Sequence, residues 1–262
     1  MARVLFDNVS FDYPIFGIKS RSFKVTLMRS LPLGSRLSGE GIVHVEALRD
    51  VSFDAQPGDR LGLIGHNGAG KSTTLRLIAG LAYPTKGNIE VKGRIVPLIE
   101  KGLGINQELS GRDNIELPLR LLGATSAEVK RAMVEIPEFT GLGEFIDVPV
   151  RAYSEGMKTR LAFAVSTFLE ADVLVLDEWL GAGDIDFQEK AERRLTTMLA
   201  KTGVVVVTSH SMHLIRKVCT HCIWFHQGRV RMEGHPDEVT AAYEEHSLEE
   251  AAAMAAAREA AQ

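Results

Sequence analysis

The residues best suited to chemistry form a glycine-rich segment that ends in a lysine and a serine. Residues 65–72 read Gly-His-Asn-Gly-Ala-Gly-Lys-Ser, which fits the pattern G-x-x-x-x-G-K-[ST]. Successive backbone N–H groups can wrap a polyphosphate only where no side chain intrudes and positive φ is allowed, which explains Gly68 and Gly70. Lys71 would then reach the β- and γ-phosphates of a nucleotide, and the Ser72 hydroxyl would bind Mg²⁺. The predicted nucleotide contacts in this segment are Gly65, His66, Asn67, Gly68, Ala69, Gly70, Lys71, Ser72 and Thr73.

Two adjacent acids and one histidine end later apolar runs. Asp177 and Glu178 end the run that begins at residue 173, and His210 ends the run that begins at residue 204. Asp177 could hold Mg²⁺ directly or through water, and Glu178 could act as general base for a water in line with the γ-phosphate. His210 could hydrogen-bond the γ-phosphate and orient that water. The alternatives are a helix-capping acid pair and a structural histidine, which is the commoner role of a lone histidine.

These residues need strands and helices to position them. Residues 60–65 are expected to form a short buried strand, and residues 71–79 a helix with an apolar stripe. Residues 173–177 and 204–210 are typical of central parallel strands, and the stretch from about 187 to 201 between them is expected to be helical. Strands that alternate with helices predict an α/β sheet, with ligands at the carboxyl ends of the strands.

The rest of the chain is expected to be largely helical. Residues 112–168 are predicted to form a helical insertion beside the sheet, with Thr125-Ser-Ala-Glu128 as a capping box and Ser154 at the start of another helix. A further helix is expected to begin after Gly234. The eight alanines of residues 251–262 favour helix but bury little apolar area, so a fraying tail is expected there, with weak docking to a partner as the alternative.

One stretch near the N-terminus differs in charge from the rest of the chain. Residues 13–39 carry five basic residues and no acid, in a protein of formal net charge −4. Ser20 could cap a helix there, with Phe23, Leu27 and Leu31 on one side. Such a basic amphipathic helix suits an anionic membrane surface or a partner helix. A solvated surface excursion is the alternative.

Composition excludes several classes of protein. The count of 30 basic and 34 acidic residues argues against a wholly basic nucleic-acid binder. No apolar run approaches the ~20 residues of a membrane-spanning helix, and the N-terminus lacks a signal-peptide core, which predicts a cytoplasmic chain that meets membranes through a partner. Cys219 and Cys222 have C-x-x-C spacing but no second ligand pair follows, so buried or incidental thiols are expected.

Taken together, the motifs resemble those of ATP-binding-cassette ATPases. Tyr153-Ser-Glu-Gly-Met157 and Gly181-Ala-Gly-Asp184 join the phosphate loop, Asp177-Glu178 and His210 in the order of that family, from about Arg3 to Glu245. The resemblance implies a P-loop α/β fold with a mixed sheet core, an antiparallel β subdomain and a helical subdomain. Within the family the pentapeptide usually reads Leu-Ser-Gly-Gly-Gln. Ser154 and Gly156 match it and would clamp the γ-phosphate of ATP held by the opposite subunit of a homodimer.

The family resemblance also assigns residues that carry no clear signal by themselves. Tyr13 would stack on the adenine, with Phe11 as the rival, and Asp184 would join the nucleotide contacts. Glu100 would take the place of the glutamine that contacts Mg²⁺ and senses the membrane partner, with Gln107 as the weaker candidate. The cofactors implied are ATP and Mg²⁺.

Tyr153, Glu155 and Met157 depart from that pentapeptide. These departures, the run Asp177-Glu-Trp-Leu-Gly-Ala-Gly-Asp184 and the long insert that begins at Tyr13 resemble those of bacterial polysaccharide exporters, the ATPases for O-antigen, teichoic acid and related lipid-linked glycans. The resemblance implies an ATPase domain over 1–245, a membrane-facing basic insert over about 14–40, a helical subdomain over about 105–168 and a tail over 246–262. Its partners would be two copies of a polytopic permease at the cytoplasmic face of the inner membrane, with lipid-linked polysaccharide as cargo and no nucleic acid. A C-terminal sugar-binding domain is not expected. The alternatives are a transporter ATPase for another cargo, such as a lipid, drug or nutrient, and a soluble cassette ATPase outside transport.

Overall fold

The computed structural model describes residues 1–15, 36–37, 43–99, 104–177 and 185–259. The chain folds into two compact units. Unit 1 comprises Met1–Arg3, Gln56–Gly58 and Val91–Val205, and unit 2 comprises Val4–Ala55, Asp59–Glu90 and Val206–Gln262. The basic insert predicted over about 14–40 lies almost entirely outside the described residues. None of the helices in the described part of the chain combines the length and the hydropathy that a bilayer-spanning segment requires.

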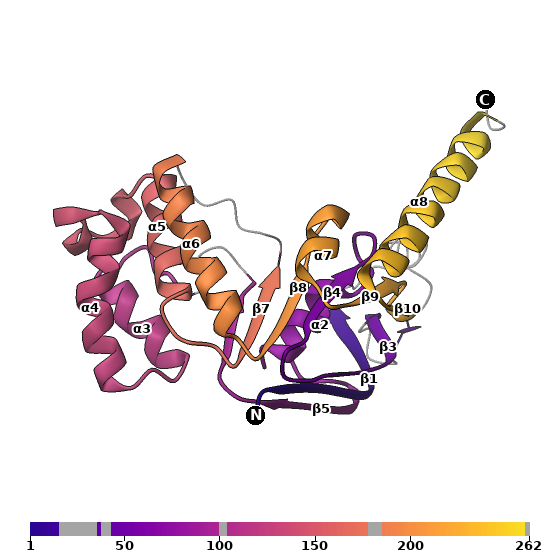
Figure 1. The fold of residues 1–262 in the computed structure, drawn as a ribbon, viewed down its shortest axis with the longest axis horizontal. Coiled ribbons are helices and arrows are strands. Elements are labelled where there is room, and N and C mark those ends of the chain that lie inside the picture. The colour runs from indigo at the N-terminus through magenta and orange to yellow at the C-terminus, as the bar shows by residue number, and fades with distance from the viewer. Residues whose placement is uncertain (16–35, 38–42, 100–103, 178–184, 260–262) are drawn as a thin grey trace. The chain divides into compact units, whose positions relative to one another are not determined.

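An antiparallel sheet forms one part of unit 2 (Figure 1). Its strand order is β2-β3-β1-β5, with bounds Arg36–Leu37, Val43–Ala55, Arg3–Ile15 and Lys86–Lys92. Phe6 of β1 pairs with Phe53 of β3, and their rings stack with centroids 4.4 Å apart. Because alternate side chains of a strand point to the same face, this pair belongs to the buried face of the sheet. The antiparallel β subdomain implied by the family resemblance is therefore present.

The second part of unit 2 carries the phosphate loop. β4 pairs in parallel with β9, and β9 pairs antiparallel with β10, so the sheet is mixed. The bounds are Arg60–Ile64 for β4, Lys71–Ile78 for α2, Met212–Val218 for α7, His221–His226 for β9, Arg229–Gly234 for β10 and Pro236–Glu259 for α8. The strand and helix expected on either side of the loop are confirmed to within one residue.

The C-terminal helix extends into the alanine-rich segment. α8 runs unbroken through the described residues to Glu259, so backbone helix persists beyond residue 251, and the predicted boundary at 245/246 lies inside it. The physical reason is the alanine content, since alanine has the highest helix propensity and needs no burial to remain helical. The first part of the helix packs against β9, β10 and α7.

Unit 1 contains the parallel pair β6 (Ile95–Leu98) and β7 (Val173–Asp177), together with a group of helices. The helices are α3 (Asp113–Leu121), α4 (Ser126–Thr140), α5 (Glu155–Ser166) and α6 (Ile185–Lys201), with short 3-10 turns at Gly143–Asp147 and Val150–Ala152. α3, α4 and α5 lie side by side, as Figure 1 shows. The helical insertion and the later helix predicted from the sequence are therefore confirmed. β8 (Val204–Thr208) begins in unit 1 and ends in unit 2, two residues before the predicted end at 210.

Aromatic packing joins the helices of unit 1. The ring centroids of Phe139 and Phe187 are 5.4 Å apart, and those of Phe163 and Phe187 are 5.8 Å apart, both edge to face. Arg194 lies over the ring of Phe139, with its guanidinium carbon 4.4 Å from the centroid. Burial of the Arg194 guanidinium lowers its pKa. Contacts of this kind hold α4, α5 and α6 together through a small hydrophobic cluster.

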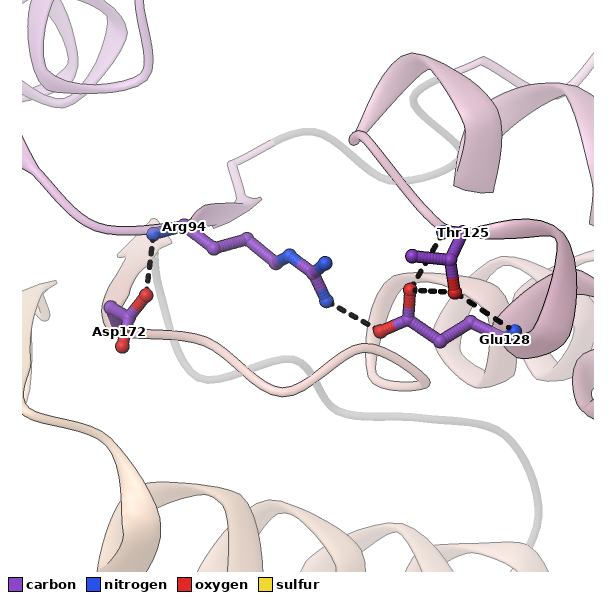
Figure 2. A network of polar contacts seen from close by, with 4 residues as sticks. All are labelled: Arg94, Thr125, Glu128 and Asp172. Carbon is purple, nitrogen blue, oxygen red and sulfur yellow. Dashed lines mark hydrogen bonds and ion pairs between the residues drawn. The ribbon is translucent and has the colours of Figure 1, made fainter.

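A polar network ties the start of α4 to the start of β6 (Figure 2). Thr125 and Glu128 form the predicted capping box: Thr125 Oγ1 accepts from Glu128 N at 3.2 Å, and Glu128 Oε2 accepts from Thr125 N at 2.7 Å. The other carboxylate oxygen, Oε1, accepts from Arg94 at 2.6 Å, and Arg94 N donates to Asp172 Oδ2 at 2.7 Å. The hydrogen bonds from Arg94 and then Thr125 lower the pKa of Glu128 to about 2.

Replacing Glu128 by glutamine should destabilise the fold at neutral pH by about 1 kcal/mol, because a charge-assisted hydrogen bond becomes a neutral one. The pKa of Glu128 in the folded chain lies below its ordinary value of 4.5, so its stabilisation is complete above pH 4.5 and is lost as the pH falls towards 2. Urea denaturation across that range should therefore show the wild-type and Glu128→Gln free energies of unfolding converging. Glu138→Gln, on an exposed position of the same helix, is the control and should match the wild type. Equal free energies for wild type and Glu128→Gln at pH 7 would contradict the network.

Candidate functional site

The phosphate loop lies between a buried strand and a helix with no side-chain cap. Four of the five residues of β4 are buried, and α2 begins at Lys71 directly after Gly70. Its N-cap residue is Gly70, which has no side chain that could cap the first backbone N–H groups of α2. A helix start of this kind presents N–H donors and the positive end of the helix dipole, which together favour an anion such as phosphate.

Two glycines of the loop have the backbone conformation that the motif requires. Gly68 and Gly70 have φ angles of +79° and +110°, as expected. At Gly70 the neighbours are close as well: a Cβ atom would lie 2.6 Å from Leu48 Cδ2 and 2.9 Å from the Ala47 carbonyl oxygen. Any side chain there would push the loop away from β3. Glycine at this position therefore lets the loop pack directly against β3.

Lys71 folds back over the loop. Its ammonium donates to the carbonyl oxygens of Gly65 at 2.6 Å and His66 at 3.0 Å. This geometry holds a positive charge at the loop itself, where phosphate oxygens would lie. Ser72 is exposed beside it, so its hydroxyl is accessible to a cation, and oxygen donors of this type suit Mg²⁺. The loop residues fit a nucleotide with its metal.

The two candidate adenine-stacking residues differ in burial. Phe11 is only 8% exposed and packs edge to face against Tyr13, with ring centroids 4.8 Å apart. Tyr13 is half-buried, and its hydroxyl lies 3.4 Å from Thr73 Oγ1 at the start of α2. Phe11 thus belongs to the core, whereas Tyr13 lies beside the phosphate-loop helix and has ring surface left for a ligand.

The other candidate residues are distributed over the two units and the segments outside the described residues. Asp177 ends β7 in unit 1 and is half-buried, while His210 follows β8 in unit 2 and is exposed. Gln107, the weaker candidate for the family glutamine, is exposed. Three predicted site residues lie outside the described part of the chain, namely Glu100, Glu178 and Asp184.

The pentapeptide lies at a helix start, as predicted. Ser154 is the N-cap of α5, and its Oγ accepts from Met157 N at 3.2 Å. Ser154 and Gly156 are both exposed, so their surface is accessible in the described part of the chain. Glu155 is 89% exposed at its side chain and pairs with Lys158 at 2.8 Å, which offsets the negative charge that this departure from the family pattern introduces.

Tyr153, another departure from the family pattern, is a packing anchor that sequence reasoning missed. The side chain is 5% exposed, and its hydroxyl donates to the Phe145 carbonyl oxygen at 2.5 Å. Burial raises the pKa of this phenol. A Cβ atom on Gly111 would clash with the same hydroxyl, so the glycine of Leu109-Ser-Gly111 and the tyrosine are matched in shape. The sequence contains both the glycine and the unusual tyrosine, but it does not indicate that the two residues are in contact.

The two cysteines agree with the expectation of inert thiols. Cys219 and Cys222 are unbonded and buried, and burial raises the pKa of each thiol to about 12. Thiolate is the form that binds metals and attacks disulfides, so neither residue is poised for that chemistry at neutral pH.

These features define a P-loop nucleotide-binding protein, and comparisons identify its family. A family model described as "ABC transporter" matches residues 48–181. The chain is 42% identical to the O-antigen export system ATP-binding protein RfbE of Yersinia enterocolitica over 89% of this chain and 98% of the relative. It is 37% identical to RfbB of Klebsiella pneumoniae, another O-antigen export ATP-binding protein, over 92% of this chain and 96% of the relative.

A relative from teichoic acid export is also similar in sequence, and a solved structure shares the fold. The teichoic acids export ATP-binding protein TagH of Bacillus cereus is 39% identical over 92% of this chain and 42% of the relative. A solved ATP-binding subunit of an ABC transporter shares the fold with a TM-score of 0.65 and 22% identity, over 92% of each chain. The chain belongs to the ABC transporter family and is of the ATP-binding subunit type.

Tyr153→Phe should lower the free energy of unfolding by about 1–2 kcal/mol, because the Phe145 carbonyl loses its hydrogen-bond donor in a buried position. Urea denaturation followed by circular dichroism measures the change. Tyr83→Phe is the matched control, since that ring is 82% exposed, and it should leave the stability unchanged. Equal stability of the two variants would show that the Tyr153 hydroxyl does not hold the segment before α5.

Proposed function

We propose that this chain is the ATP-hydrolysing subunit of an ABC transporter that exports lipid-linked polysaccharide, of the O-antigen or teichoic acid type, across the cytoplasmic membrane. The main observation in support of this cargo is the 42% identity to an O-antigen export ATP-binding protein over 98% of that relative's length. Support for the nucleotide comes from the phosphate loop, where Gly70 leaves no room for a side chain and Lys71 folds over the backbone.

The residues of the loop would bind the phosphates of ATP and the metal. Backbone N–H groups at the start of α2 and the Lys71 ammonium would hold the β- and γ-phosphates. The hydroxyl of Ser72 and the carboxylates of Asp177 and Glu100 would supply the oxygen ligands that Mg²⁺ prefers. When bound, the metal neutralises charge on the phosphates. Tyr13 would stack on the adenine, since it is the half-buried ring beside α2.

Hydrolysis would depend on a base and an orienting group from this chain. Glu178 would take a proton from the attacking water, and His210 would hydrogen-bond the γ-phosphate and hold that water in line. Because the protein does little covalent chemistry in phosphoryl transfer, these groups would contribute by positioning the water and by stabilising the charge of the transition state. Asp184 would join the contacts around the nucleotide.

Two copies of the chain would enclose the nucleotide. Ser154 and Gly156 stand at an open helix start, which can offer a hydroxyl and a backbone N–H to the γ-phosphate of ATP held by the other copy. The Glu155–Lys158 pair keeps the local charge close to neutral, so the unusual acid does not oppose the phosphate. Closure of the homodimer on ATP would drive the transporter, and hydrolysis would reset it.

The membrane partner would be a polytopic permease in two copies, with this chain bound peripherally at the cytoplasmic face of the inner membrane. The basic stretch over about 14–40 is suited to anionic headgroups or to the permease, and no nucleic acid is involved. Other cargo, such as a lipid, a drug or a nutrient, and a role outside transport are the competing functions.

Glu178→Gln should give a dimer that forms with ATP and Mg²⁺ but not with ADP, because trapped ATP bridges the two copies when the base is absent. Size-exclusion chromatography with light scattering measures the mass. Glu170→Gln, in an exposed pair with Lys201, is the control and should behave like the wild type. A monomer under every nucleotide condition would reject the shared-nucleotide arrangement.

Purification of the detergent-solubilised complex from its natural membrane should yield this chain with a polytopic permease and a bound lipid-linked glycan, detected together by mass spectrometry. Lys71→Ala should assemble the same complex but abolish ATP hydrolysis and glycan display at the cell surface, since the ammonium that holds the phosphates is gone. Recovery of ribosomal proteins or DNA in place of a permease would overturn the transport function, and a permease with another bound lipid or solute would overturn the cargo alone.

A further inference from the structure

A histidine at the end of β9 faces two side chains of α8 in unit 2. His226 is the last residue of β9, and His246 and Glu250 lie on one face of α8, because residues four apart are neighbours on a helix. One ligand atom from each of the three side chains lies within 4.8 Å of the other two. The imidazole ring centroids of His226 and His246 are 5.4 Å apart. None of the nucleotide-binding motifs includes these residues.

We propose that His226, His246 and Glu250 bind a divalent transition-metal cation of the zinc class. Imidazole and carboxylate are the ligands that such ions accept, and three protein ligands with one position left to water is a common arrangement. Ligand atoms bound to one zinc ion lie about 3.3–3.6 Å apart. His246 Nε2 and Glu250 Oε1 are already 3.4 Å apart, so side-chain rotation of His226 would complete the set.

The site is reachable from solvent. Both histidines are half-buried and Glu250 is exposed, so an ion can enter without unfolding of the chain. α8 provides two ligands and β9 the third, so a bound ion would tie the C-terminal helix to the sheet that carries the phosphate loop. The ring of His226 also contacts the ring of His66 in that loop, with centroids 5.3 Å apart.

An arginine occupies the place that the ion would take at His246. Arg231 donates to His246 Nε2 at 2.8 Å, and since arginine can only donate, Nε2 accepts and the imidazole carries its proton on Nδ1. This is the neutral form, with a lone pair at Nε2, that ligates metals. Arg231 is exposed and its guanidinium carbon lies 4.6 Å from the centroid of the Trp224 ring, so it can leave Nε2 and stay on the ring face. The cation and Arg231 therefore compete for one nitrogen.

Titration of the full, untagged chain with Co²⁺ alone, and with Zn²⁺ in competition, tests the site without nucleotide. The expected result is one ion per chain, with a visible Co²⁺ absorption that Zn²⁺ removes. His246→Ala and Glu250→Gln should each weaken binding by about tenfold or more, because each removes a ligand. Glu249→Gln, at the exposed neighbouring position on α8, is the matched control and should bind as the wild type does.

Arg231→Gln distinguishes a built site from loose surface binding, because loss of the competing guanidinium should tighten binding several-fold. Trp224 gives a second readout: its ring centroid is 5.3 Å from that of His246, so Co²⁺ should quench its fluorescence in a Trp179→Phe background, where it is the only tryptophan. Binding that is unchanged by both His246→Ala and Glu250→Gln, or an absence of Co²⁺ binding in the wild type, would overturn the proposal and leave Arg231 as the resident cation of the cluster. Neither result bears on ATP hydrolysis, so the proposed function is tested separately.

Discussion

The close contact between the phosphate loop and its neighbours is the constraint on which the nucleotide-binding part of the chain depends. Gly70 lies against Leu48 and Ala47 of β3, and the Gly228 N–H donates to the Ala69 carbonyl oxygen at 3.1 Å. The loop is therefore held from two sides by backbone and small apolar atoms. A loop fixed in this way does not have to be ordered by its ligand, which reduces the entropy lost on binding. The absence of a side chain at Gly70 is what allows this close packing.

In unit 1 a glycine also permits close packing, next to the segment that precedes α5. The Tyr153 hydroxyl fills the position that a side chain on residue 111 would need, and its hydrogen bond to the Phe145 carbonyl holds the turn that leads to Ser154. Tyr153 thus replaces the leucine that is usual in the family, and the glycine at position 111 leaves room for its hydroxyl. This replacement does not alter the exposed surface at Ser154 and Gly156. The altered pentapeptide can therefore still present these two residues to a phosphate.

Helix propensity explains the length of the C-terminal helix, and tertiary packing explains the position of its earlier turns. Alanine-rich sequence extends α8 through residue 259, whereas the earlier turns carry Tyr243 and His246 against Trp224 of β9. Packing of aromatic and imidazole rings positions that part of the helix, and the polar atoms left at its edge, on His246 and Glu250, become neighbours of His226. The proposed cation site, built from β9 and α8, follows from this packing.

Local rules determined much of this protein from its sequence alone. Interactions within a few residues decide the loop at residues 65–72 and the strand and helix beside it, and also the capping box at Thr125 and Glu128 and the N-cap at Ser154. The residue types at these positions were therefore enough to predict them. Tertiary structure alone decided that Phe11 is core while Tyr13 keeps ring surface beside α2, that Tyr153 fits Gly111, and that α8 brings His246 and Glu250 to His226. These outcomes depend on which distant surfaces pack together, and no pattern of neighbouring residues carries that information, because contact across the fold is set by the shape and burial of whole elements.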